Sequence, residues 1–206
     1  MSPRPYRLGQ RQVAADETRA RVLAAARTQL ARETSFSIDA VARRADVARM
    51  TVYYQFGSKR GLLEALFDLL AARGGLHQLP SAFQQSDPKV ALDRLIEIFA
   101  HFWSSDRVVM RRLRAMAALD PELDQVLRER SEGLRNGLRV IVSRLPKGGA
   151  PIGETVDLLF ALTSFENFDL LAGKARTPEE VGPLVKRAAA AIVAARPGNA
   201  PRGRAR

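Results

Sequence analysis

The 206-residue chain carries 33 Lys and Arg against 22 Asp and Glu, contains no cysteine and is 46% hydrophobic. This hydrophobic content is ordinary for a packed globular protein, and the length suits one medium domain or two small ones. Without cysteine there are no disulfides, thiolate metal sites or cysteine nucleophiles. The N-terminus lacks the apolar core of a signal peptide, and the longest apolar run, Ala188 to Ala195, is too short to span a bilayer. We therefore expect a cytoplasmic protein that does not enter a membrane.

The net charge of +11 is concentrated near the two ends of the chain. Residues 1–74 carry 13 Lys and Arg against 7 Asp and Glu, whereas residues 75–196 carry 17 against 15. The last ten residues hold three Arg and no acid. This distribution favours nucleic acid as a partner. The alternative is a basic soluble protein whose charge serves no particular partner.

The first elements in chain order are a basic arm and a helix. We expect residues 1–15 to have little fixed structure and a first helix to run from about residue 16 to 32. A short second helix follows, because its apolar residues recur at the spacing of one helix face. These residues are Ile38, Val41, Ala42 and Ala45.

A tight turn and a second short helix come next. Asp46-Val47-Ala48 breaks the apolar pattern, and the following segment, Arg49–Phe56, has only Val52 and Phe56 at inward spacing. A short helix that buries two residues and displays Arg, Thr and Tyr is suited to touch another molecule. The arrangement is a helix-turn-helix, whose second helix lies in the DNA major groove.

The side chains of this segment suggest roles at DNA. Arg49, at the start of the second short helix, can reach a guanine edge, and Met50 and Thr51 can meet thymine methyl groups. A hydroxyl, a phenol or an ammonium group can each bind a phosphate oxygen, and a helix N-terminus binds phosphate as well. Of Tyr53 and Tyr54 we expect Tyr54 to be the more buried. The predicted DNA-binding residues are Ser37, Arg49, Met50, Thr51, Tyr53, Tyr54, Gln55 and Lys59.

The same segment resembles the DNA-binding domain of the TetR family of bacterial transcriptional regulators. TVYYQFGSK, Thr51–Lys59, is similar to the family signature T-x-Y-x-x-F-x-x-K, and SIDAVA, residues 37–42, is similar to its T-V-x-x-I-A segment. The resemblance covers about residues 16–72. It implies phosphate contacts by Thr51, Tyr53 and Lys59, and a cavity for a small effector among later helices.

Two departures from the family pattern concern the turn. Asp46 stands where the family usually has Gly, and Asp tolerates left-handed backbone better than most residues. Ala48 stands where the family usually has Ser or Thr, so the second short helix lacks a side-chain N-cap at a cost of about 1 kcal/mol.

The rest of the chain reads as helices separated by Pro- and Gly-containing loops. Asp87-Pro88 and Thr177-Pro178-Glu179-Glu180 are helix starts, the second of them a capping box. Loops are expected at residues 77–86 and 146–153. Helices are expected at about residues 59–73, from 88 with an apolar stripe reaching Trp103, and at 106–119, 121–145, 154–172 and 178–196.

These elements predict an all-α protein of about nine helices without internal repeats. Residues 16–74 form a three-helix, homeodomain-like helix-turn-helix domain, and residues 75–196 form a helical effector-binding and dimerisation domain. Residues 1–15 are a flexible basic arm, and residues 197–206 a disordered basic tail.

Aromatic and Met residues gather in the second domain. At helical spacing such residues are usually core, but the resemblance implies an effector pocket between helices of this kind. The predicted effector-binding residues are Phe99, Phe102, Trp103, Met110, Met116, Phe165 and Asn167. The only histidines, His77 and His101, share no metal-binding spacing with carboxylates, so neither a metal site nor a cofactor is expected.

The last two helices carry more apolar residues than one neighbouring helix can cover. We therefore expect them to form a homodimer interface, which would place two helix-turn-helix units on a palindromic site. Ordinary packing inside one chain is the alternative. The predicted interface residues are Val156, Leu159, Thr163, Phe168, Leu184, Ala188 and Ile192.

The sequence thus predicts a dimeric, sequence-specific DNA-binding transcriptional regulator, a repressor released from its double-stranded operator by a small-molecule effector. The alternative is a ligand-independent dimeric regulator whose second domain only dimerises. No glycine-rich phosphate loop, metal cluster or nucleophile–base pair occurs in the sequence, so we do not expect an enzyme.

Overall fold

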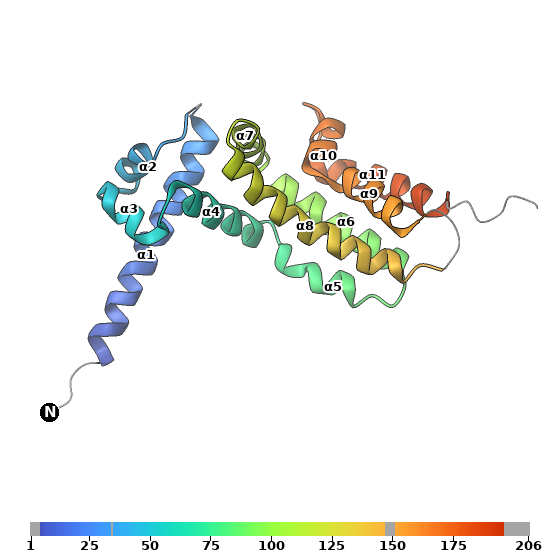
Figure 1. Cartoon of the computed structure of the whole chain (residues 1–206), viewed down its shortest axis with the longest axis horizontal. Helices are drawn as coiled ribbons and strands as arrows, with labels where there is room; N and C mark the ends of the chain where they lie inside the picture. The colour runs from blue at the N-terminus through green and yellow to red at the C-terminus, as the bar shows by residue number, and fades with distance from the viewer. Residues whose placement is uncertain (1–4, 34, 147–150, 196–206) are drawn as a thin grey trace, which may run out of the picture. The chain divides into compact units, whose positions relative to one another are not determined.

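The computed structural model describes residues 5–33, 35–146 and 151–195, with side chains from residue 10 onward, and these segments are helical almost throughout (Figure 1). They contain eleven α-helices, one short 3-10 helix and no strand. The all-α prediction is confirmed, although the expected count of about nine helices is too low. The predicted tail, residues 197–206, lies outside the described residues. No helix in the described segments is both long and apolar enough to cross a membrane.

The chain divides into two compact units. The first contains the residues up to Leu70 together with Val108–Val126, and the second contains Ala71–Arg107 together with the residues from Leu127 onward. The helices α4, Lys59–Arg73, and α8, Pro121–Ser143, each contribute to both units.

The first unit is built around α1. Its other helices are α2 and α3, which follow α1 directly, the greater part of α4, and α7. Its core contains the nearly inaccessible side chains Val22, Ala26, Leu30, Val41, Val52, Leu62, Leu66 and Leu113. The bounds are α1 Pro5–Arg32, α2 Ile38–Ala45, α3 Arg49–Phe56 and α7 Arg107–Ala117.

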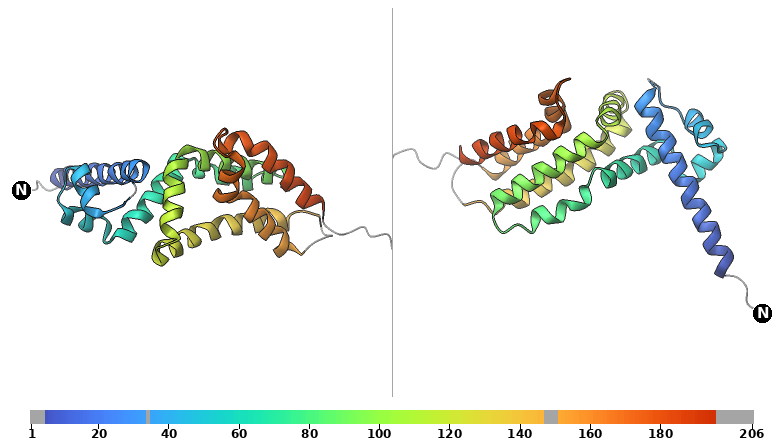
Figure 2. Two further views of the ribbon diagram at one scale, coloured as in Figure 1. Left: turned by 90° about the horizontal axis from the view of Figure 1, so that it is seen from above. Right: turned by 180° about the vertical axis from the view of Figure 1, so that it is seen from behind.

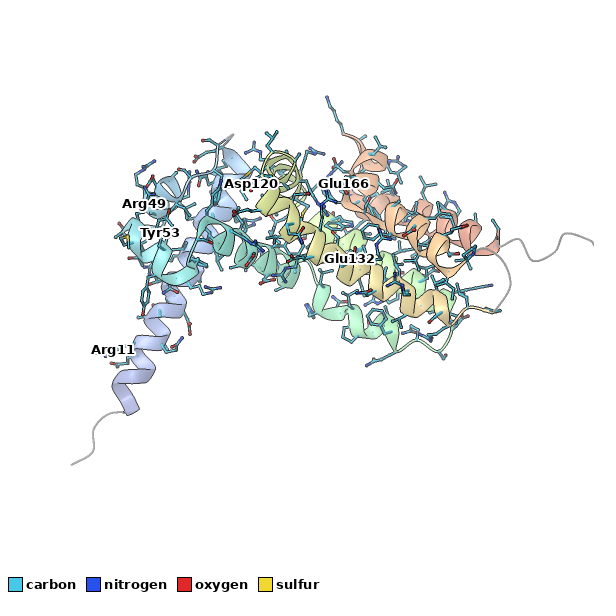
Figure 3. The ribbon with its side chains drawn as sticks, viewed as in Figure 1. Arg11, Arg49, Tyr53, Asp120, Glu132 and Glu166 are labelled. Carbon is cyan, nitrogen blue, oxygen red and sulfur yellow. The ribbon has the colours of Figure 1, made fainter. Side chains whose placement is uncertain are left out.

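Helix α1 is longer than predicted, because residues 5–15, expected to have little fixed structure, are helical. Extending an existing helix needs no new nucleation, and α1 is anchored by its buried second half. The extension has local support, since the Gln12 amide donates to Asp16 Oδ1 at 3.0 Å and the Thr18 hydroxyl donates to the Ala14 carbonyl at 2.8 Å. Arg11 lies exposed on this extension (Figure 3). Residues 1–4 of the predicted arm lie outside the described residues.

Helix α7 is fastened to the end of α1. The Arg112 guanidinium donates to the carbonyl oxygens of Leu30 at 2.9 Å and Glu33 at 2.6 Å. The last carbonyls of a helix have no partner within it, so Arg112 satisfies the C-terminal end of α1. This contact joins two segments that are far apart in the sequence.

The second unit is centred on α6, which buries residues on most of its circumference. Helix α11 packs along α6, with α9 and α10 beside α11 and α5 on another part of α6 (Figure 2). The predicted helix starts at Asp87 and Thr177 are confirmed, including the reciprocal bonds of the capping box with Glu180. The bounds are a 3-10 helix at Leu76–Gln78, then α5 Leu79–Phe83, α6 Pro88–Ser105, α9 Ile152–Thr163, α10 Phe165–Ala172 and α11 Pro178–Ala194.

The loop predicted at residues 77–86 is wrong, because this segment contains the end of the 3-10 helix and the whole of α5. Arg144, about 60 residues further along the chain, donates hydrogen bonds to the end of this segment. Its guanidinium donates to the carbonyls of Phe83, Gln85 and Ser86, with distances of 3.2 Å to Phe83 and 3.0 Å to Ser86. The Phe83 carbonyl is the last of α5, the Gln85 and Ser86 carbonyls follow it, and without Arg144 all three would need other donors.

The single helix predicted for 154–172 is broken at Ser164, where the backbone is extended. The indole N–H of Trp103 donates to the Thr163 carbonyl at 3.0 Å, and the Ser164 hydroxyl accepts the Asn167 N–H at 3.3 Å. In an unbroken helix Thr163 and Asn167 would have bonded to each other. Both groups therefore have substitutes, and the chain can turn between α9 and α10 without a buried polar group left unpaired.

Arg107, at the start of α7, holds the end of α10. Its guanidinium donates to Asp169 Oδ1 at 2.6 Å and to the Gly173 carbonyl at 2.8 Å, and also to the carbonyls of Asp169 and Arg176. Both side chains of the ion pair are largely covered. Charge-assisted bonds in such surroundings are stronger than those on an open surface.

Candidate nucleic-acid interface

Ser37 caps the start of α2, where the sequence predicted a helix N-terminus. The Ser37 hydroxyl accepts the Ala40 N–H at 3.2 Å, and Asp39 lies in the first turn, where a negative charge is favourable. The face predicted to be buried is confirmed for Ile38, Val41, Ala42 and Ala45.

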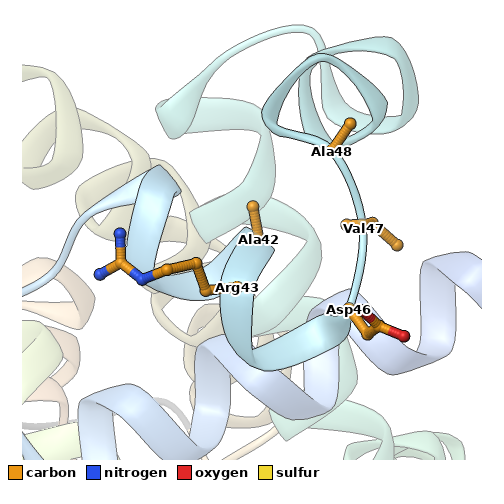
Figure 4. A pocket seen from close by; sticks show the side chains of 5 residues that line it. All are labelled: Ala42, Arg43, Asp46, Val47 and Ala48. Carbon is orange, nitrogen blue, oxygen red and sulfur yellow. The ribbon is translucent and has the colours of Figure 1, made fainter.

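The turn between α2 and α3 depends on Asp46. This residue has φ 53° and ψ 54°, the left-handed conformation expected where the family pattern has Gly. The N–H of Val47 donates to the Ala42 carbonyl at 3.1 Å and closes the end of α2. Ala48 makes no side-chain cap to α3, as predicted. A shallow open hollow lies at this turn, lined by Ala42, Arg43, Asp46, Val47 and Ala48 (Figure 4).

The inner side of α3 is formed by Val52 and Phe56. Val52 is 1% exposed, and Phe56 is partly covered by the Arg19 guanidinium, 4.5 Å from its ring centre. Arg19 also donates to the Gln55 carbonyl at 3.1 Å and so satisfies the end of α3. The outer side of the helix is open.

The exposure of the two tyrosines is the reverse of the prediction. Tyr54 is 90% exposed, whereas Tyr53 is half-buried, so the expectation that Tyr54 would be the more buried is wrong. Tyr54 is two residues from Val52 and therefore points nearly away from it, given about 100° of rotation per residue. Met50 is 72% exposed, and both residues are available to a partner.

Arg49 is held by side chains from two helices. Its Nη1 donates to the two carboxylate oxygens of Asp39 at 3.1 and 3.2 Å, and its Nη2 donates to the Tyr53 hydroxyl at 3.3 Å (Figure 3 labels Arg49 and Tyr53). The hydrogen bond to Tyr53 and the neighbouring Asp39 carboxylate raise the pKa of Arg49 above its ordinary value. The charged guanidinium thus has acceptors on both sides at the start of α3.

The corner between α3 and α4 places Lys59 at the start of α4, as predicted. The Ser58 hydroxyl accepts the Gly61 N–H at 3.0 Å and caps α4. A Cβ atom added to Gly61 would lie 2.1 Å from the Phe56 carbonyl oxygen, so only Gly permits this close approach. Exposed Lys59 therefore lies next to a helix N-terminus, which favours an anion.

The predicted DNA-binding residues thus occupy one short stretch of structure. Ser37 marks the start of α2, Lys59 the start of α4, and the other predicted residues belong to α3. Thr51 and Gln55 are half-buried there. Sequence reasoning did not identify Asp39, Arg19 or Gly61, whose roles depend on contacts between helices.

The predicted effector-binding residues are only partly brought together. Phe102 and Trp103 lie 4.4 Å apart between ring centres, Trp103 and Phe165 lie 5.6 Å apart, and Phe99 contacts the first two. Asn167 donates its side-chain amide to the Leu162 carbonyl at 2.7 Å, so this group is used within the chain. Met110 and Met116 belong to α7 in the first unit. No group of three His, Asp or Glu side chains suited to a metal ion occurs among the described residues.

Four of the seven predicted interface residues are core residues. The chain itself fully buries Val156, Leu159, Thr163 and Phe168. The prediction that these four side chains face a partner is therefore wrong. Apolar residues at neighbouring positions on the same helices point outward instead, with Leu158 56% and Leu184 37% exposed. Ala188 and Ile192 are half-buried on α11.

Comparison with known proteins agrees with this geometry. Residues 22–66 match the sequence model of bacterial regulatory proteins of the tetR family. This segment contains the C-terminal part of α1, all of α2 and α3, and the start of α4, which are the elements that carry the candidate interface. No curated protein matches the sequence.

Several solved structures share the fold. A putative TetR-family transcriptional regulator from Rhodococcus sp. is 19% identical with a TM-score of 0.70, covering 86% of this chain and 99% of that one. A TetR transcription regulator from Haloarcula marismortui is 15% identical with a TM-score of 0.68, covering 88% and 98%. The transcriptional regulator FadR from Bacillus subtilis, solved in complex with stearoyl-CoA, is 17% identical with a TM-score of 0.66, covering 85% and 98%.

A helix-turn-helix whose second helix is open on its outer side is the arrangement of a DNA-binding domain. The match over residues 22–66 identifies this segment as a DNA-binding domain of the tetR type, as its sequence signature indicated, and the chain shares its fold with solved TetR regulators.

Proposed function

We propose that this protein is a sequence-specific, homodimeric, cytoplasmic repressor that a small-molecule effector releases from its operator. The observation that carries the DNA-binding part is the exposure of α3, with Arg49 hydrogen-bonded to Asp39 and Tyr53 at its start and Met50 and Tyr54 open to solvent. A helix N-terminal Arg of this kind can donate to a guanine edge in the major groove.

The dimer part of the proposal is supported by the outward apolar residues of α9 and α11. These helices pack on each other within the chain, and each exposes a leucine, Leu158 and Leu184. The half-buried Ala188 and Ile192 lie one and two turns after Leu184 on α11. If these side chains form one continuous apolar surface, that surface is suited to association with a second copy.

The effector part of the proposal is supported by the aromatic cluster of Phe99, Phe102, Trp103 and Phe165 in the second unit. FadR, one of the similar structures, was solved with stearoyl-CoA, which makes a ligand with an apolar part a reasonable first class to test. The alternative is a regulator without a ligand, whose aromatic cluster is core alone.

Trp103 offers a direct test of the effector proposal, since it is the only tryptophan and its indole bonds to the chain at the α9–α10 break. A ligand that enters this cluster should change Trp103 fluorescence and weaken operator binding by about 1–3 kcal/mol, a typical coupling energy between two sites. Titration of a panel of fatty acids and acyl-CoA esters measures both. If no member of a broad ligand panel changes either signal, the ligand-independent alternative is favoured.

The DNA-binding proposal is tested by comparing Arg49→Ala with Lys59→Ala. Losing Arg49 should cost about 1–3 kcal/mol on the preferred duplex and relax the preference at one base pair per half-site. Losing Lys59 should weaken binding to all sequences about equally and lower the slope of log affinity against log salt by about one per subunit.

The measurement is a titration of both variants at several salt concentrations. The two DNA samples are a duplex selected from a random pool by the wild-type protein and a shuffled duplex of the same composition. Equal loss of sequence preference in both variants, or an unchanged preference in Arg49→Ala, would show that these roles are wrongly assigned.

A further inference from the structure

Asp39 on α2 contacts Arg49 on α3, the residue that the proposed function places against a base edge. Its carboxylate accepts from Arg49 Nη1 at 3.1 and 3.2 Å, and the two side chains remain 51% and 57% exposed. The Tyr53 hydroxyl receives Arg49 Nη2 from the other side at 3.3 Å. Asp39 and Tyr53 thus hold the two terminal nitrogens of one guanidinium.

This arrangement leaves Arg49 able to donate further. A guanidinium carries more N–H groups than these contacts use, and a planar group held on two sides loses less freedom when it meets a base edge. An exposed ion pair is also weak, so it can rearrange when DNA arrives.

The same carboxylate acts against phosphate. Beside Asp39 much of the positive charge of Arg49 is compensated, and the carboxylate repels a phosphate group that approaches the same place. A guanine edge presents neutral acceptors and meets much less of this repulsion. Arg49 is therefore a poor partner for the DNA backbone as long as Asp39 is charged.

We infer that Asp39 is a positioning residue that makes Arg49 selective for base edges over phosphates. The inference rests on the proposed function of α3 as the helix that contacts bases. A simpler role for Asp39 exists, since a carboxylate in the first turn of α2 also stabilises that helix. The experiment must separate selectivity from stability.

Asp39→Asn and Asp46→Asn form a matched pair for this purpose. Each removes one negative charge from the motif, but no hydrogen bond or ion pair joins Asp46 to Arg49 among the described contacts. Asn also tolerates the left-handed backbone that Asp46 adopts. The quantity measured is the discrimination ratio, the affinity for the wild-type-selected duplex divided by that for the shuffled duplex.

Asp39→Asn should lower the discrimination ratio roughly tenfold, because a freed Arg49 loses precision at the base edge and gains contacts to phosphate. Its salt slope on the shuffled duplex should steepen by about one per subunit. Asp46→Asn should either leave the affinities for both duplexes unchanged or raise both by the same factor. Its discrimination ratio should therefore equal that of the wild-type protein. Thermal unfolding of both variants records any change in stability separately.

A double-mutant cycle with Arg49→Ala completes the test. If Asp39 acts through Arg49, Asp39→Asn should change the ratio no further in the Arg49→Ala background. An unchanged ratio in Asp39→Asn, or an equal fall with and without Arg49, would overturn the inference while the proposed function stands. A wild-type protein that does not distinguish the selected duplex from the shuffled one would overturn both.

Discussion

Replacing Gly61 with Ala is expected to destabilise the first unit by about 1–3 kcal/mol, the usual cost of forcing an extra group into a packed place. The added Cβ would lie 2.1 Å from the Phe56 carbonyl oxygen, and a backbone atom cannot move aside as a side-chain end can. Relief requires the corner between α3 and α4 to open. Operator binding should therefore fall more than the loss of stability alone explains. Urea unfolding and operator titration measure the two effects.

Gly133→Ala is the control for this substitution. Gly133 lies inside α8, and a Cβ there meets nothing within 4 Å. The control should gain roughly 0.5–1 kcal/mol, because Ala restricts the unfolded chain and suits a helix better than Gly. If Gly61→Ala behaves like this control, the close approach at the α3–α4 corner does not restrict the sequence.

Replacing both Leu158 and Leu184 with Glu is expected to convert the proposed dimer into monomers. Both side chains are partly exposed in the chain, so the fold should tolerate the change, whereas the charges would be buried in the interface. Losing the second half-site should weaken operator binding by roughly 10²-fold or more, the usual gain from linking two binding modules. Sedimentation at micromolar concentration and operator titration check this.

Val90→Glu serves as the control, because Val90 on α6 is exposed to a similar degree and lies on a different helix. It should remain a dimer. Phe168 is unsuitable for such a test, since a charge at this fully buried position would damage the core rather than only the association. A wild-type protein that sediments as a monomer, or a Leu158/Leu184 variant that stays dimeric, contradicts the proposed interface.

The parts of the fold that follow from local sequence were predicted well. The face of α2, the start of α6 at Asp87 and the capping box at Thr177 depend on residues within one or two turns of each other. At the break before α10 the Ser164 cap is local, but the Thr163 carbonyl is satisfied by Trp103, 60 residues before Thr163, and no local pattern signals that contact. The short α5 likewise ends on an Arg144 guanidinium from far along the chain.

In the candidate site, too, local features were predicted and contacts between helices were not. The signature fixed the place of α3 and Lys59, but spacing alone could not tell which tyrosine faces outward or that Asp39 holds Arg49. On α9 and α11 apolar residues occupy both inward and outward positions. Periodicity then finds an apolar helix without separating core residues such as Leu159 from surface residues such as Leu158.

The attachment of α7 to α1 bears on how regulators of this type can be recombined. The family match ends at Leu66, yet the compact unit that contains it also includes Val108–Val126. A fragment cut after α4 would lack Arg112 and leave the Leu30 and Glu33 carbonyls without their donor. A chimera that exchanges the DNA-binding unit between relatives therefore needs three junctions, after Leu70, Arg107 and Val126, where the sequence signature alone suggests one.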